Sequence, residues 1–246
     1  MSVPGKDKYS SENLNAGHRQ RLRERFLNGG IPALSAHEVI ELLLTYSIPQ
    51  KDVKPLAKQL LEGNKTVLEV ISQPQHALEK VPGLGTNSAA SLRMFFECMQ
   101  YCLAEQCSER VLLPSSEELR NFVRMKLGVR HHECYMAVFL NSRNYLISYD
   151  IIAEGTVDNV LNYPRNMVEM ALNKGACKML LVHNHPSGVC TPSNEDIAAT
   201  GECSRSLATL GIELIDHLIV TRNECFSFLD NGLGLDGNIT GGTNEQ

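Results

Sequence analysis

The chain has 246 residues, of which 43% are hydrophobic and 21% are charged, and its net charge is −5. This composition is that of an ordinary soluble globular protein with one or two cores. No apolar run approaches membrane-spanning length, and the first residues lack the apolar core of a signal peptide, so we expect no membrane partner. The eight cysteines form no C-x-x-C pair, which suits a reducing compartment and predicts a cytoplasmic protein.

The first part of the chain carries a short basic segment. Residues 1–107 have a net charge of +1, whereas residues 108–246 have a net charge of −6. The segment holds four arginines within seven positions: Arg19, Arg21, Arg23 and Arg25. Such a cluster can contact phosphate groups, for example those of DNA, or an acidic partner. It can equally form the solvated face of a helix.

Short helices follow the basic segment. Ser35 and Glu38 form a capping-box pattern before an apolar run that reaches Leu44. Two further helices are predicted over residues 55–61 and 67–71. The sequence Pro82-Gly83-Leu84-Gly85 then lies between two helical stretches and resembles a helix-hairpin-helix motif. Gly83 and Gly85 would let backbone N–H groups approach a phosphate, although such hairpins also serve purely as packing turns.

The second half alternates between helices and strands. A linker is expected near residues 106–114, followed by a helix that Ser115 and Glu118 cap. The remaining pattern predicts strands over 134–140, 145–152, 177–182, 212–221 and 225–229, and helices over 164–173 and 193–210. Residues 231–246 are rich in glycine and asparagine, and we expect them to be disordered. The predicted organisation is a helical domain (1–107), an α/β domain (108–230) and a tail (231–246).

The densest chemistry lies at His183-Asn184-His185-Pro186, and Asp196 lies 11 residues after His185. Because side chains alternate along extended chain, His183 and His185 point to the same side. Together with Asp196 they offer three ligands, which leaves a fourth tetrahedral position open, as in catalytic zinc sites. The histidines could instead be satisfied core residues, and Ser193 with Asp196 also matches a helix cap and its acidic N3 partner. Cys190, in the same loop, would close the site if it became a fourth ligand.

This pattern, His-x-His, seven residues that begin with Pro186 and then Ser-x-x-Asp, resembles the JAMM (MPN+) metalloprotease signature. The surrounding sequence is similar to that of RadC proteins over about residues 110–230. That similarity extends to Gly155-Thr156, Tyr163-Pro164-Arg165 and Asp216-His217. The resemblance implies an α/β fold with a JAMM-type mixed sheet flanked by helices, preceded by a small all-α domain.

The resemblance also assigns roles to residues. It implies one Zn²⁺ per chain, held by His183, His185 and Asp196, and a general acid/base at the start of a strand, which is Glu133 here. Glu154 is the alternative because it also precedes a glycine turn. Ser193 matches the serine that donates to the developing oxyanion.

The implied activity is hydrolysis of an amide, peptide or isopeptide bond. A different class of function stays open, namely a non-catalytic factor in DNA repair or recombination whose metal site is structural or vestigial.

Overall fold

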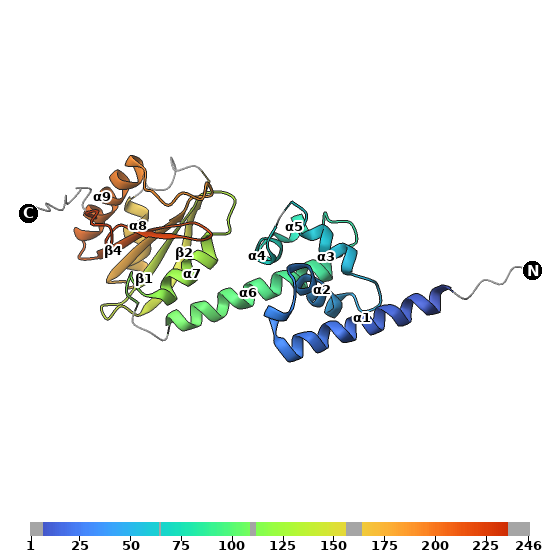
Figure 1. Ribbon diagram of the computed structural model, residues 1–246. Coiled ribbons are helices and arrows are strands. Elements are labelled where there is room, and N and C mark those ends of the chain that lie inside the picture. Colours follow the sequence, from blue (N-terminus) through green and yellow to red (C-terminus); the bar gives the residue numbers. More distant parts are fainter. Residues whose placement is uncertain (1–6, 64, 109–111, 156–163, 236–246) are drawn as a thin grey trace, which may run out of the picture. The chain divides into compact units, whose positions relative to one another are not determined.

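The structure is a computed structural model that describes residues 7–63, 65–108, 112–155 and 164–235. It divides into two compact units, Met1–Met99 and Gln100–Gln246, each described by itself (Figure 1). The division falls inside helix α6 (Thr86–Ser108), earlier than the expected linker. The last turns of α6 belong to the second unit because Cys107 is part of its core and Gln100 donates to the carbonyl of Met125.

The first unit is all-helical, as the sequence predicts. The capping boxes of Ser35 with Glu38 and Thr66 with Glu69 begin two of its helices. Leu22, Ile40 and Leu44 are among the buried apolar residues of this unit. The elements are α1 (Asp7–Gly29), the 3-10 helix η1 (Ile31–Ala33), α2 (Ala36–Ser47), α3 (Lys54–Leu60), α4 (Val67–Ile71), α5 (Gln75–Leu78) and the start of α6.

The second unit is built on a mixed sheet. Its described strands are β1 (Cys134–Leu140), β2 (Leu146–Glu154), β3 (Lys178–Asn184), β4 (Glu213–Val220) and β5 (Cys225–Ser227). They form a five-stranded sheet in the order β2-β1-β3-β4-β5. Only β3 and β4 pair in parallel among these strands, and helix α9 (Asn194–Ala208) connects them. The expected α/β fold with a mixed sheet is therefore confirmed.

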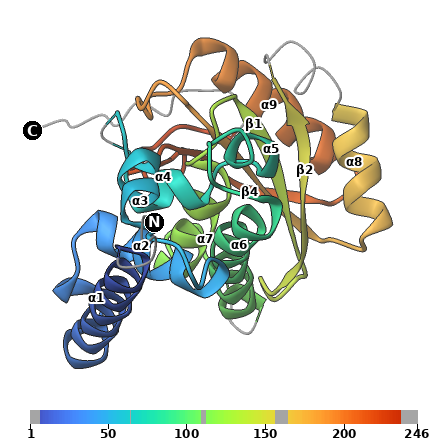
Figure 2. The same ribbon diagram turned by 90° about the vertical axis from the view of Figure 1, so that its right-hand side faces the viewer.

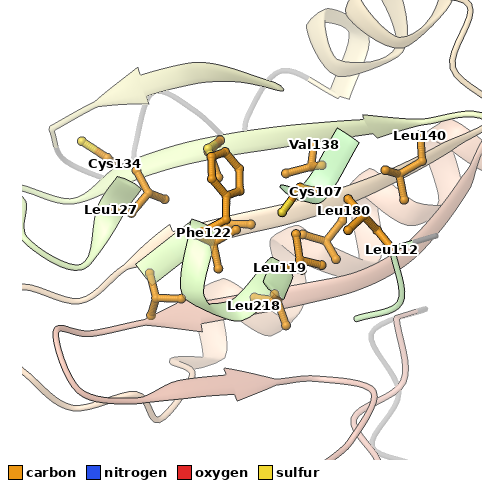
Figure 3. Packing of buried hydrophobic residues seen from close by; sticks show 14 residues of the cluster. Cys107, Leu112, Leu119, Phe122, Leu127, Cys134, Val138, Leu140, Leu180 and Leu218 are labelled. Atoms are coloured by element: carbon orange, nitrogen blue, oxygen red, sulfur yellow. The ribbon is translucent and has the colours of Figure 1, made fainter. Parts of the chain in front are cut away.

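Helices cover both faces of this sheet (Figure 2). Helix α7 (Glu117–Leu127), whose N-cap is Ser116 and not the expected Ser115, lies on one face. On this face Phe122 and Leu127 pack against Cys134 and Val138 (Figure 3). Helices α8 (Pro164–Asn173) and α9 lie on the other face, where Tyr135 and Phe139 are buried. Because every residue of β1 is buried, its sequence is a continuous apolar run.

The strand register positions the candidate site. In the antiparallel pair of β1 and β3, Tyr135 lies opposite His183. Continuing this register by two residues brings Glu133 opposite His185, on the same face of the sheet. The face that holds Tyr135 and His183 is also the face that α9 covers, so the first turn of α9 lies over the ends of these two strands.

The chain after β5 begins in an ordered turn. Leu233 donates its N–H to the carbonyl of Phe228, and Gly232 donates to Leu229. The start of the expected disordered tail is therefore packed, and its residues 236–246 lie outside the described residues. Thr156 and Tyr163 also lie outside the described part of the chain. None of the helices that the structure describes is long and apolar enough to cross a lipid bilayer.

Candidate metal site

Three side chains from two elements converge at the end of the sheet. His183 is the next-to-last residue of β3, His185 follows that strand, and Asp196 lies in the first turn of α9. Nε2 of His183 lies 2.9 Å from Nε2 of His185 and 3.3 Å from Oδ1 of Asp196. Nε2 of His185 lies 3.6 Å from Oδ2 of Asp196. We call His183, His185 and Asp196 the ligand cluster.

These separations fit a tetrahedral metal. Ligands that lie about 2.0–2.1 Å from a zinc ion in a tetrahedron are about 3.3 Å apart, and the three measured distances bracket this value. The potential donor atoms all lie within 4.8 Å of one another. Two imidazole nitrogens and one carboxylate oxygen are thus positioned to bind a metal ion.

The capping and metal patterns at Ser193 and Asp196 coexist. Ser193 accepts a hydrogen bond from the N–H of Asp196, and its own N–H and hydroxyl donate to Oδ2 of Asp196 at 2.8 and 2.7 Å. The cap fixes the carboxylate in the first turn of α9, where Asp196 is only 2% exposed. The cap therefore orients the carboxylate toward the histidines.

Side chains around the ligand cluster hold it in place. The Tyr135 ring stacks on that of His183 with centroids 4.7 Å apart, and its hydroxyl donates to Oδ1 of Asp196 at 3.3 Å. The buried ring of His217, on β4, lies 2.8 Å from Nδ1 of His183. Of the pair Asp216-His217, only His217 contacts the ligand cluster. Asp216 instead accepts hydrogen bonds from Ser227 and from backbone N–H groups at His217 and Leu229.

The electrostatics favour neutral rings at His183 and His217 and an ionised carboxylate at Asp196, whereas a hydrogen bond with Asp196 raises the pKa of His185. Burial, together with the neighbouring His217, lowers the pKa of His183 well below its usual value, and burial lowers the pKa of His217 to about 4. Burial alone would raise the pKa of Asp196, but hydrogen bonds from His185 and Ser193 outweigh it and lower that pKa. Neutral imidazoles and a carboxylate are the protonation states that bind a metal.

The two candidate glutamates lie in different environments. Glu133 is half-buried directly before β1, and the register of β1 and β3, continued by two residues, places it opposite His185 and beside the ligand cluster. Glu154 pairs across the sheet with Cys134, on the α7 face, and its side chain forms an ion pair with Arg130. Of the two, only Glu133 lies on the face of the ligand cluster.

Asn184, between the two histidines, points to the opposite face and holds the segment that carries Glu133. Its Oδ1 accepts the N–H of Cys134 at 2.8 Å, and its Nδ2 donates to the carbonyls of His132 (3.1 Å) and Arg130 (3.4 Å). Neither Asn184 nor Tyr135 was identified from the sequence as a site residue. The alternation of side chains along β1 and β3 was the available signal.

Cys190, considered as a fourth ligand, does not join the ligand cluster in the described part of the chain. It is buried in the loop between the histidines and α9, and its thiol lies 3.7 Å from the hydroxyl of Thr221. The fourth position of a tetrahedral metal is thus not filled by this thiol.

The four arginines of α1 separate into two kinds. Arg19 is buried, and its guanidinium donates to the carbonyls of Ile48, Pro49 and Lys51 after α2. Arg25 donates to Glu38 and to the carbonyl of Ala33. The expectation that Arg19 contacts phosphate is therefore wrong, because its guanidinium is buried and its N–H groups donate to backbone carbonyls.

Arg21 and Arg23 are exposed. In the hairpin between α5 and α6, the backbone of Gly83 has φ +90°, a conformation that residues with a side chain rarely adopt. A Cβ atom added at Gly85 would meet open space.

Comparisons with known proteins agree with this architecture. Residues 113–233 match the RadC-like JAB domain, the class that the mixed sheet and the ligand cluster define, and residues 15–90 match the UPF0758 N-terminal family. A UPF0758 protein of Fusobacterium nucleatum is 37% identical over 230 residues, covering 91% of this chain and 99% of that protein. UPF0758 proteins of Rhodobacter capsulatus (37% identical, 86% and 99% covered) and Ralstonia pickettii (32%, 87% and 95%) are also similar. The chain belongs to the UPF0758 family of proteins with a RadC-like JAB domain.

Proposed function

We propose that the protein is a zinc-dependent hydrolase that cleaves an amide, peptide or isopeptide bond. The observation that carries the proposal is the convergence of His183, His185 and Asp196 on one point, with Glu133 beside them on the same face. The spacing of the three donors and their nitrogen and oxygen chemistry suit Zn²⁺. When bound there, zinc would polarise the scissile carbonyl and lower the pKa of water to about 7.

Residues of the chain bind the metal and transfer the proton. His183, His185 and Asp196 hold the ion. Glu133 accepts the proton of the attacking water and returns it to the leaving amine, which is the usual part of a general base and acid. Asn184 fixes the backbone on both sides of Glu133 and so limits where its carboxylate can reach.

Ser193 is proposed to donate a hydrogen bond to the developing oxyanion. Its hydroxyl has a single proton, which it donates to Asp196 in the structure. The proposed role requires this proton to be redirected when substrate is bound, while Asp196 keeps the hydrogen bond from the Ser193 N–H.

The test compares two glutamates that differ in which face of the sheet they occupy. Zinc-loaded wild type, Glu133→Gln and Glu154→Gln are profiled on a broad peptide and isopeptide library by mass spectrometry. We expect Glu133→Gln to retain zinc and stability but to lose about 10²–10⁴ in cleavage rate, and Glu154→Gln to cleave like wild type. Equal rates for wild type and Glu133→Gln would refute the mechanism.

A second proposal concerns the first unit, which we infer contacts DNA without reading its sequence. The supporting observations are the exposed Arg21 and Arg23 and the glycine hairpin at Gly83 and Gly85, whose open backbone gives N–H groups room to approach a phosphate. Such a contact is compatible with the hydrolase and also with a non-catalytic repair or recombination factor.

We place the protein in the cytoplasm, because the described cysteines are free thiols.

A further inference from the structure

A chain of buried groups joins the backbone of one candidate ligand to the ring of another. Oγ1 of Thr200, on α9, lies 2.6 Å from the carbonyl oxygen of Asp196 and 2.6 Å from Nδ1 of His217. Nε2 of His217 lies 2.8 Å from Nδ1 of His183. Thr200, His217 and His183 are all fully buried, so water does not supply alternative partners along this path.

The hydrogen bond between Thr200 and the carbonyl of Asp196 determines the position of each proton. A carbonyl oxygen can only accept, so the single hydroxyl proton of Thr200 points to Asp196. The hydroxyl must then accept from His217, which places a proton on Nδ1 of His217. In a neutral imidazole the other nitrogen is an acceptor. Nε2 of His217 therefore accepts, and the proton between the two rings belongs to Nδ1 of His183.

We propose that Thr200 and His217 are positioning residues that fix His183 in the tautomer with its proton on Nδ1. The lone pair of Nε2 in His183 then points at Asp196 and His185, ready for a metal. If the two hydrogen bonds of His217 ran in the opposite direction, a proton would lie on Nε2 of His183 and would exclude the ion. This inference rests on the metal-binding part of the proposed function and not on catalysis.

Ring stacking supports the same arrangement. Phe228 stacks on His217 with centroids 4.8 Å apart and planes 22° apart, and Tyr135 stacks on His183 with planes 16° apart. The stacked neighbours hold each imidazole in its plane, so the nitrogens stay directed along the chain of hydrogen bonds. A partner that orients the second nitrogen of a metal-binding histidine typically contributes 10–100-fold to metal affinity.

The proton positions can be read directly. Long-range ¹H–¹⁵N correlation spectra of ¹⁵N-histidine-labelled full-length protein, metal-free and zinc-loaded, report which ring nitrogen carries a proton. The His217 signals are identified by their absence in His217→Phe. We expect His217 to be protonated on Nδ1 only, in both states. A proton on Nε2 of His217, alone or in addition, would overturn the proposal.

Matched substitutions at Thr200 test the consequence for the metal. Thr200→Val keeps the shape but removes the hydroxyl, whereas Thr200→Ser keeps it. In competition with a chromophoric chelator, we expect Thr200→Val to bind zinc roughly 10–100-fold more weakly and Thr200→Ser to bind like wild type. Equal affinity in the two variants would contradict the proposal.

If Thr200→Val fails to fold, the proton positions in the wild-type protein still decide the question. Neither measurement needs a substrate. Both can therefore support the roles of Thr200 and His217 even if the protein cleaves no peptide.

Discussion

Asp196 combines three interactions in one carboxylate. It is a member of the ligand cluster, it accepts two hydrogen bonds from Ser193 at the start of α9, and it accepts one from the Tyr135 hydroxyl. A buried carboxylate without partners would be strongly destabilising. Because hydrogen bonds already stabilise its charged form, the cluster retains an anionic ligand even before a metal binds.

At the residue scale the sharpest prediction concerns His185. Its side chain is 14% exposed, against 0% for His183, so His185→Ala removes a ligand with less disturbance of the core. We expect the variant to fold like wild type but to lose stoichiometric zinc, from about one ion per chain to none after dialysis, because two ligands do not make a stable site. Metal analysis by mass spectrometry, with circular dichroism as the folding check, measures this.

His131→Ala is the matched control, since His131 is exposed and lies outside the ligand cluster. It should retain zinc. Retained zinc in His185→Ala would instead mean that the ligand assignment is incorrect.

The clustering of His183, His185 and Asp196 could be predicted from the sequence because their spacing is local. His183 and His185 alternate along one strand, and Asp196 follows after a turn. Tyr135 could not be assigned, because it meets Asp196 from 61 residues away through strand register and helix placement. The same holds for Thr200, whose contact with His217 depends on how α9 packs on β4.

At the scale of elements, Asn184 joins the turn before β1 to the end of β3. We predict that Asn184→Ala lowers the free energy of unfolding of the metal-free protein by about 1–3 kcal/mol, because the buried N–H of Cys134 loses its partner. Urea denaturation measures the change. Asn173→Ala, at the exposed end of α8, should change stability by less than about 0.5 kcal/mol. Similar values for the two variants would show that the bridge is not stabilising.

Helices α1 and α2 are joined by an ion pair whose contribution depends on pH. Hydrogen bonds from Arg25 and then from the Ser35 N–H lower the pKa of Glu38 to about 2. Because the folded-state pKa is depressed, the stabilisation is present above the unfolded pKa of about 4.3. It is lost as the pH falls toward 2. Arg25 is half-exposed, so solvent screening reduces the effect below what the pKa alone implies.

Glu38→Gln should therefore destabilise the protein by about 1 kcal/mol at pH 7, and the difference from wild type should shrink between pH 4.5 and pH 2. Urea unfolding at pH 7 and pH 3 tests this, with the exposed Glu62→Gln as a control that should match wild type at both. A difference that grows on acidification would contradict the assignment.

At the scale of the whole molecule, the sequence predicts the helical first unit and the mixed sheet because capping boxes and apolar runs are local signals. The capping box at Ser35 and the fully apolar β1 are examples. The division between the units was harder to predict. Helix α6 continues through it without a glycine or proline, and its last turns join the second core by packing, as Cys107 does.

The proposed DNA contact is tested by its response to salt. Binding of fluorescein-labelled duplexes of unrelated sequence to the full chain, followed by anisotropy, should be weak, equal across sequences and steeply reduced by salt. Each neutralised phosphate contributes a slope of about −0.9 to the dependence of log affinity on log salt concentration. Arg21→Ala combined with Arg23→Ala should thus reduce the magnitude of this negative slope by about 2.

Arg143→Ala with Arg165→Ala removes two exposed charges from the second unit and leaves the net charge equal to that of the first double variant. If the exposed arginines of α1 contact phosphates, only the first pair changes the slope. Equal losses in both double variants would mean that net charge alone governs the interaction. No binding of wild type at low salt would contradict the proposed DNA contact and would leave the hairpin at Gly83 as a packing turn.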